Sequence, residues 1–183
     1  MRRIALIFLC SLSGLTADPR AGQFLVATRE LADPNFAQSV VLLVGANDQG
    51  AFGLVINRPT TISANRALPQ APNTVLIFEG GPVEVFRVAA LRRAPGVDQV
   101  LRGVSYLTEP RAIQRAIKDD LSSLRLYAGY AGWTAGQLDQ EIAAGAWKLL
   151  PATADLVFDP VPETLWKRLI RRTETLTARL SGR

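Results

Sequence analysis

The sequence predicts an α+β fold, in which a mixed, mostly antiparallel sheet and a few flanking helices form a single domain. Apolar and β-branched runs, the pattern of buried strands, outnumber the segments with helical periodicity, and several are joined by loops of hairpin length. A doubly wound parallel sheet would instead place a helix between successive strands. The 183 residues also contain no internal repeat, low-complexity tract or domain-length linker, so one domain is expected.

The first half of the chain supplies most of the expected strands. They cover residues 23–27, 39–44, 52–56, 74–78 and 84–90. The second and third should form a hairpin, because Asn47, Asp48 and Gly50 between them are turn-forming residues. Residues 60–68 have a weakly helical pattern and are expected to lie outside the sheet.

The second half alternates strands with helices. Strands are expected at 100–107, 121–128 and 145–150, and helices are expected to start at Thr108, Thr134 and Pro162. Thr108 is a suitable N-cap, because Ile113 and Ile117 follow four residues apart on one helical face. The last helix should extend to about Leu180.

The segment from Tyr127 to Ile142 should join a strand to a helix. Its glycines are Gly129, Gly132 and Gly136. Thr134 and Gln137 have the spacing of a capping box, which predicts a helix that begins at Thr134. The glycines would serve tight packing of strand against helix, or free N–H groups at the helix start would bind an anion.

Residues 1–17 have the order of features of a signal peptide. Arg2 and Arg3 precede a short apolar run over 4–10, and small and polar residues follow up to Ala17. The mature domain would then cover 18–183, and the protein would be exported to the periplasm. The alternative is an ordinary N-terminus on a cytoplasmic protein.

Composition excludes several kinds of chemistry. The chain contains no histidine, which excludes Ser-His-Asp and Cys-His catalysis and histidine-ligated zinc. The single cysteine, Cys10, lies within the predicted signal peptide, so the mature domain would have no thiol chemistry. No cofactor or metal is expected. The formal net charge of +5 includes Arg2 and Arg3 and gives no strong indication of nucleic-acid binding.

Four segments resemble, in order, the motifs of the YqgE/AlgH family. They are Phe24–Leu43, Gly50–Pro59, Gly80–Val83 and Tyr127–Leu138 with Glu141. The resemblance runs from about Phe24 to Trp166. It implies an α+β fold with a bifurcated sheet that closes into a pseudo-barrel. It implies no catalytic activity, since none is established for the family, and a role in regulating transcription (alginate production) has been ascribed to the AlgH branch.

The chain departs from the family pattern at two histidine-bearing positions. Gly45-Ala46 stands where members usually have Glu-His, and Glu84–Arg92 replaces the Gly-Phe-Val-Leu-His pattern. Any activity that depends on those histidines would be absent here. Typical members also resemble cytoplasmic proteins, in contrast to the signal-like N-terminus of this chain.

Two neighbouring sets of residues are the candidate binding site. They are Asn57, Arg58, Glu79, Gly80 and Gly81 in the first set, and Gly129, Gly132, Trp133 and Gln137 in the second. Arg58 could hold a carboxylate or phosphate through two hydrogen bonds. Alternatively, Arg58 pairs with Glu79 or another acid and only ends a strand.

These observations predict a non-catalytic binding or regulatory module whose partner is a small ligand or a protein. The alternative is a carboxylate-dependent hydrolase or phosphotransferase at the Arg58–Glu79 region, which requires acids to converge. Loop acids available for this role are Asp33, Asp48, Glu79, Glu84 and Asp159. Turn formation explains Asp33, Asp48 and Asp159 equally well.

The terminal helix is basic and amphipathic. Its cations are Lys167, Arg168, Arg171, Arg172 and Arg179, and its apolar residues include Trp166, Leu169, Leu176 and Leu180. This pattern is typical of a docked helix with a solvated face, and it would also suit peripheral contact with an anionic membrane. Nucleic-acid binding is not expected, because no helix-turn-helix pattern is present.

Overall fold

The computed structural model describes residues 18–69, 71–96 and 98–181, and the side chains in these ranges up to Thr175. The signal-peptide prediction for residues 1–17 lies outside the described residues. So do the predicted roles of the Leu176, Arg179 and Leu180 side chains. Within the described ranges, no helix combines the length and apolar character needed to cross a membrane.

The described chain contains ten strands in one branched sheet and four α-helices. The strands are β1 (Gln23–Ala27), β2 (Val40–Asn47), β3 (Gly50–Val55), β4 (Pro59–Ser63), β5 (Leu76–Glu79), β6 (Val83–Arg92), β7 (Gln99–Leu101), β8 (Val104–Leu107), β9 (Leu124–Thr134) and β10 (Trp147–Pro151). The helices are α1 (Pro110–Asp119), α2 (Gln137–Ala143), α3 (Ala154–Val157) and α4 (Leu165–Ser181). Short 3₁₀ turns cover Ala64–Arg66, Leu121–Ser123 and Pro162–Thr164.

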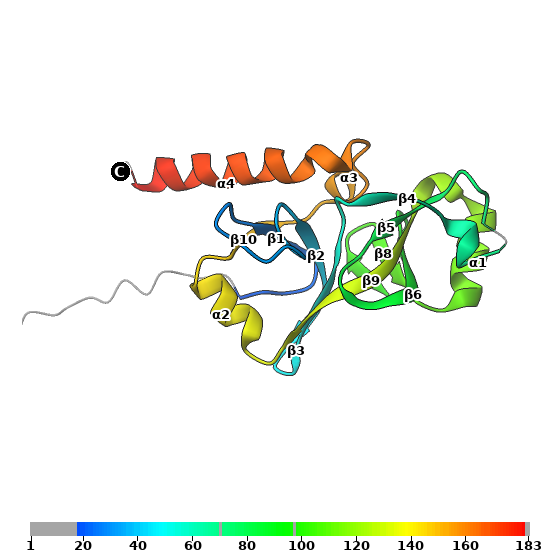
Figure 1. Ribbon diagram of the computed structural model, residues 1–183, viewed down its shortest axis with the longest axis horizontal. Helices are drawn as coiled ribbons and strands as arrows, with labels where there is room; N and C mark the ends of the chain where they lie inside the picture. The colour runs from blue at the N-terminus through cyan, green and yellow to red at the C-terminus, as the bar shows by residue number, and fades with distance from the viewer. Residues whose placement is uncertain (1–17, 70, 97, 182–183) are drawn as a thin grey trace, which may run out of the picture.

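The sheet forks along β9, the longest strand. The path β10-β1-β2-β3-β9 is antiparallel, and β3 pairs only with the C-terminal end of β9, from Ala131 to Thr134. The N-terminal part of β9 pairs with β6 on one side and, in parallel, with β5 on the other. Figure 1 shows β9 running diagonally between the two halves of the molecule. The α+β class and the curled, bifurcated sheet expected from the sequence and the resemblance are confirmed.

Glycines at the fork allow the backbones of β3, β5 and β9 to meet. Gly80 accepts a hydrogen bond from Val55 N (2.8 Å) and donates one to Ala128 O (2.8 Å), so it joins both branches. A Cβ on Gly129 would lie 2.3 Å from the carbonyl oxygen of Gly81. Because no side chain tolerates such a separation, glycine is required where the strands diverge.

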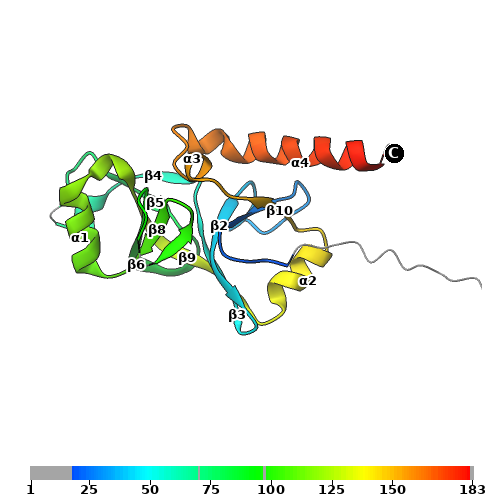
Figure 2. The same ribbon diagram turned by 180° about the vertical axis from the view of Figure 1, so that it is seen from behind.

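The two branches cover separate hydrophobic cores. The larger core lies around β1, β2, β3 and β10, and includes Trp147 and Trp166. The smaller one lies between the other branch and α1, where Ile113 and Leu126 are buried. Helix α4 crosses β1 on the outside of the larger core, and the indole N–H of Trp166 donates to Ala27 O at 2.8 Å (Figures 1 and 2).

The basic face of α4 is exposed, as the sequence indicates. Lys167, Arg171 and Arg172 point into solvent, whereas Arg168 pairs with Asp159. Peripheral membrane contact through this face stays a prediction.

The segment that follows Tyr127 differs from the expected strand, glycine turn and helix. β9 continues through Gly129 and Gly132 to Thr134, because Ala128 and Tyr130, on either side of Gly129, pair with β6 and Gly132 pairs with β3. Helix α2 begins at Gln137, with Gly136 as its N-cap at φ +73°, so the predicted start at Thr134 is wrong. Gln137 Oε1 still accepts a hydrogen bond from Thr134 N (3.1 Å), as in one half of a capping box.

Three further expectations need correction. Residues 59–63 form β4 instead of a helix, since Pro59 and Ser63 pair with β5. Residues 100–107 form two strands, because Gly103 at φ +78° turns the chain back on itself. Helix α1 has Glu109 as its N-cap instead of Thr108, and Pro110 fills the first helical position.

Candidate functional site

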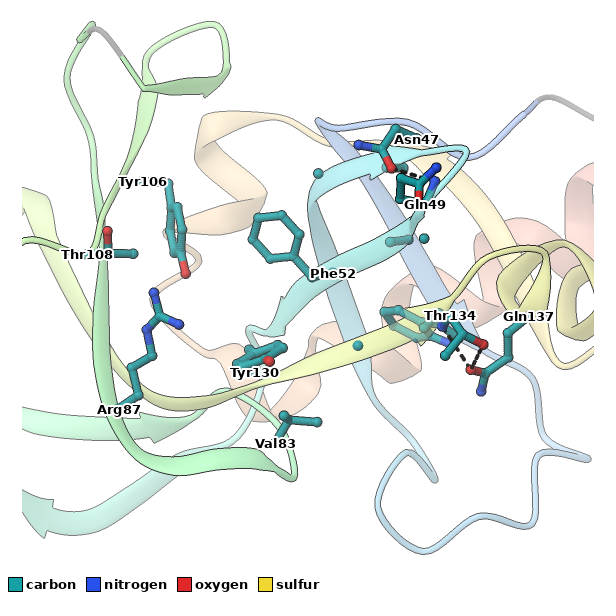
Figure 3. A pocket seen from close by; sticks show the side chains of 16 residues that line it. Asn47, Gln49, Phe52, Val83, Arg87, Tyr106, Thr108, Tyr130, Thr134 and Gln137 are labelled. Atoms are coloured by element: carbon teal, nitrogen blue, oxygen red, sulfur yellow. Dashed lines mark hydrogen bonds between the residues drawn. The ribbon is translucent and has the colours of Figure 1, made fainter.

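An open cleft of about 730 Å³ lies between the β2–β3 hairpin and strands β6 and β8. Figure 3 shows Phe52 of β3 on one side, Tyr106 of β8 on the other, and Tyr130 of β9 below them. The fork creates this space, because β3 leaves β9 in one direction while β6 pairs with it on the opposite edge. Residues far apart in sequence thus line one concave surface.

Aromatic rings form the apolar part of the cleft. The ring centroids of Phe52 and Tyr106 are 6.1 Å apart, and Phe52 is partly exposed. The Phe52 ring lies directly on Gly45, where a Cβ would be 2.5 Å from it. Gly132 leaves the face of β9 beside the Tyr130 ring uncovered. The lack of side chains at Gly45 and Gly132 therefore makes room for the Phe52 and Tyr130 rings.

Arg87 supplies the positive charge of the cleft. The register of β6 against β9 breaks between Val83 and Val88, and Glu84 at φ +47° marks this bulge. Figure 3 shows the guanidinium of Arg87 directed between Tyr106 and Tyr130. Its partner is Glu84 (3.1 Å), in a pair whose side chains are both about half exposed.

The environment keeps these groups in their hydrogen-bond-donating forms. The hydrogen bond from Arg87 to Glu84 raises the pKa of the Arg87 guanidinium above its ordinary value. Burial raises the pKa of the Tyr106 hydroxyl, although the charge of Arg87 opposes the shift. At neutral pH, Arg87 is therefore a cation and Tyr106 a neutral hydroxyl.

The other end of the cleft is polar. Asn47 and Gln49 lie at the tip of the β2–β3 hairpin, where Asn47 Oδ1 accepts a hydrogen bond from Gln49 N (2.8 Å). Thr134 at the end of β9 and Gln137 at the start of α2 also line this end (Figure 3). Amide and hydroxyl groups at this end could orient a bound polar group.

Glu141 fixes the position of the wall between β9 and α2. Its Oε2 atom accepts hydrogen bonds from the indole N–H groups of Trp133 (2.9 Å) and Trp147 (2.8 Å), and Oε1 accepts one from Gln137 (3.0 Å). Phe36 stacks on Trp133 with ring centroids 6.0 Å apart. Trp133 and Gln137 are thus held in place before any ligand arrives.

The structure brings three of the predicted site residues into this cleft: Gly132, Trp133 and Gln137. Asn57 and Arg58 do not line it. Asn57 is buried, accepts a hydrogen bond from Val40 N (2.8 Å) and donates one to Gln38 O (3.0 Å). Both residues hold the loop before β2, whose Gln38 has φ +57°.

Arg58 also has protein partners for its guanidinium. It donates to Asn35 O (2.7 Å), Ala37 O (3.0 Å) and Glu79 Oε1 (3.0 Å). The pairing with Glu79, the alternative to a ligand clamp, is therefore present. Gly80 and Gly81 meet Gly129 at the fork, and ligand binding by this set stays a prediction.

Four of the five loop acids have separate local partners, including Glu79 with Arg58. Asp33 accepts a hydrogen bond from Asn35 N (2.8 Å), Glu84 pairs with Arg87, and Asp159 pairs with Arg168. Within the described residues, no three Asp, Glu, His or Cys side chains gather as a metal ion requires.

The four residues that dominate the cleft were missed by sequence reasoning: Phe52, Arg87, Tyr106 and Tyr130. One sequence signal did point to their location. Gly45-Ala46 and the segment that begins at Glu84 are the two places where the chain departs from the family pattern, and both contribute to the cleft.

Fold and cleft together define a single-domain α+β protein whose forked half-barrel carries an aromatic, cation-containing cleft. The chain belongs to the AlgH-like family, whose model matches residues 24–177. This finding confirms the resemblance seen in the four sequence motifs. The molecular function of the family is uncharacterised.

Individual relatives agree with this assignment. A UPF0301 protein of Streptomyces avermitilis is 36% identical over 175 residues, covering 88% of this chain and 91% of the relative. A UPF0301 protein of Thioalkalivibrio sulfidiphilus is 36% identical over 176 residues, covering 87% and 92%.

Solved structures support the fold. The solution structure of the AlgH protein from Pseudomonas aeruginosa has a TM-score of 0.68 at 32% identity, covering 98% of this chain and 93% of that one. The crystal structure of protein DIP2367 from Corynebacterium diphtheriae has a TM-score of 0.71 at 26% identity, covering 85% and 87%.

Proposed function

We propose that this protein is a non-catalytic binding module whose cleft takes a small ligand with a planar apolar part and an anionic group. The observation that carries the proposal is the position of Arg87 between Tyr106 and Tyr130, beside the exposed ring of Phe52. Aromatic faces accept flat apolar groups, and a guanidinium recognises carboxylates and phosphates.

The energetics of the Arg87–Glu84 pair favour exchange with a ligand. Both side chains are about half exposed, and exposed ion pairs of this kind contribute little to stability. A charge-assisted hydrogen bond from a guanidinium to a ligand anion that lies between aromatic rings is stronger than an exposed ion pair. A bound anion can therefore replace Glu84 as the partner of Arg87.

The protonation states of the cleft support binding instead of proton transfer. A general acid or base works best when its pKa lies near the working pH. The pKa values of Arg87 and Tyr106 are both raised, so both groups remain hydrogen-bond donors at neutral pH. In a regulatory role, occupancy of the cleft would itself be the signal.

A pair of probes with the same shape and different charge tests the proposal. Titration of the labelled protein with naphthalene-2-carboxylate, followed by two-dimensional NMR, should shift resonances of Phe52, Tyr106 and Tyr130. Naphthalene-2-carboxamide, with the same ring and no charge, should bind about ten- to hundredfold more weakly, which corresponds to roughly 1.4–2.8 kcal/mol.

Variants then assign the selectivity to one residue. Arg87→Ala should bind the carboxylate as weakly as the carboxamide. Arg29→Ala is the matched control, because Arg29 and Glu174 form an ion pair of similar exposure outside the cleft (50% and 48%, against 54% and 52% for Arg87 and Glu84). Equal binding of both probes to the unaltered protein, or equal losses in both variants, would refute the proposal.

We also propose that residues 1–17 direct export, because Arg2 and Arg3 precede the apolar run as in signal peptides. Mass spectrometry of the N-terminus from fractionated cells should find a periplasmic chain that starts near Asp18. A cytosolic chain with Met1 intact would contradict export, and it would leave the transcriptional role ascribed to the AlgH branch open to this protein.

A further inference from the structure

A second, apolar groove of about 530 Å³ lies on the face of β9 next to Ala128. One wall comes from β4 and β5 with Ile62 and Ile77, and the other comes from the β6 bulge with Val85 and Val88. Ile77 also belongs to the smaller core under α1, and Val88 and Ala128 pack against that core. The groove is therefore the end of that core that α1 leaves uncovered.

An aromatic side chain projects beside this groove. Phe86, on the β6 bulge, is 96% exposed, and the neighbouring Val85 is 50% exposed. Ile62 on the opposite wall is also exposed. A contiguous apolar surface of this kind usually marks an interaction site, because monomers rarely leave such patches in water.

We propose that this surface binds a second copy of the same chain. Phe86 is a projecting group, and the adjacent groove is a receptor for such a group on the same face of the molecule. A twofold interface requires a self-complementary surface, in which each copy both inserts and receives the same residue. Phe86 of each copy would enter the groove of the other.

Charges on and beside the groove would also match under a twofold axis. Arg66 lines the groove, is exposed and has no ion-pair or hydrogen-bond partner among the described residues. Glu84 precedes Phe86 by two residues, is half exposed, and pairs with Arg87 of its own chain (3.1 Å). In the proposed dimer, Glu84 of one copy exchanges this exposed partner for Arg66 of the other copy, twice in each dimer, so opposite charges flank both apolar contacts.

Sedimentation of the full chain over a range of concentrations tests the proposal. The unaltered protein should show a concentration-dependent monomer–dimer equilibrium. Phe86→Ser should raise the dimer dissociation constant at least about thirtyfold, as expected for a central aromatic anchor. An unaltered protein that remains monomeric at several hundred micromolar would overturn the proposal and leave the groove to a different partner.

A pair of valines provides a matched control. Val85→Asp places a charge in the interface and should abolish the dimer. Val161 has the same exposure of 50% but lies beside α3, outside the groove, so Val161→Asp should leave dimerisation unchanged. Equal effects of the two substitutions would show that the patch is not the interface. Circular dichroism verifies that both variants fold.

Charge reversal tests the twofold geometry. Glu84→Arg and Arg66→Glu should each weaken self-association about tenfold or more. A mixture of the two variants should form a heterodimer with near-normal affinity, because each interface pair then again joins opposite charges. If the mixture associates no better than either variant alone, this geometry is wrong.

Discussion

Replacing Gly129 by alanine tests whether the fork requires a residue without a side chain. Gly129 has φ +72°, a conformation that costs an alanine about 1–2 kcal/mol. Its Cβ would also lie 2.3 Å from Gly81 O and 2.9 Å from Val83 O. Both are backbone atoms that no side-chain rotation can move, and relief of such overpacking costs about 1–3 kcal/mol. The expected loss of unfolding free energy is therefore roughly 2–5 kcal/mol.

Gly136 supplies the control for the conformational part of this loss. It has φ +73°, but an added Cβ would meet nothing within 4 Å. Gly136→Ala should cost only about 1–2 kcal/mol. Urea denaturation of both variants measures the difference through the midpoint and the slope. If the two variants lose the same unfolding free energy within about 0.5 kcal/mol, close packing at the fork is not the reason that position 129 requires glycine.

Two further substitutions test the carboxylates of Glu141 and Asp159, which accept hydrogen bonds from neighbouring elements. Glu141→Gln replaces the charged acceptor of both indole N–H groups by a neutral amide and places an NH₂ donor where one of the two oxygens accepts, so it should cost about 1–3 kcal/mol in urea denaturation and change the fluorescence of Trp133 and Trp147. Burial opposes ionisation of Asp159, but hydrogen bonds from Arg168 and a backbone amide outweigh it and lower its pKa. Asp159 therefore contributes stability above its unfolded pKa of about 3.9, and this contribution is lost as pH falls through the lower folded pKa. Asp159→Asn should destabilise the fold at pH 7 by about 1–3 kcal/mol and by progressively less below pH 4, and a loss that does not change with pH would contradict this.

The strands with strong local signals could be predicted from sequence. The hairpin between β2 and β3 follows from turn residues such as Asn47 between two apolar runs, and the structure confirms it. The strand β4 could not be predicted in this way. Its residues, Pro59–Ser63, are half-exposed, and they are extended because Thr60 donates a hydrogen bond to Ile77 O (2.6 Å) from a distant strand.

Pairing with distant strands also explains why the glycines of β9 lie in a strand instead of a turn. Local rules assign Gly129 and Gly132 to a turn, since glycine weakens an isolated strand. In the folded chain, however, Phe52 of β3 pairs with Gly132, and Val83 of β6 pairs with Tyr130. A single sequence contains no record of these partners.

The cleft was hidden from sequence reasoning for a related reason. Phe52, Tyr106 and Tyr130 belong to three strands, and nothing in their spacing indicates that they share one surface. The direction of Arg87 depends on the break in register after Val83. Trp133 and Gln137 were found because they lie in one continuous motif beside the cleft.

The position of β9 in the chain also determines when the protein can fold. Both branches of the sheet close on β9, yet β9 begins only at Leu124, and its partner in β3 includes Phe52. During synthesis, the strands that precede β9 can form hairpins but cannot join into a closed sheet. Pairing over such long separations is slow and leaves apolar edges unpaired in the meantime. The emerging chain therefore remains incompletely folded, and dependent on protection from aggregation, until most of it has been made.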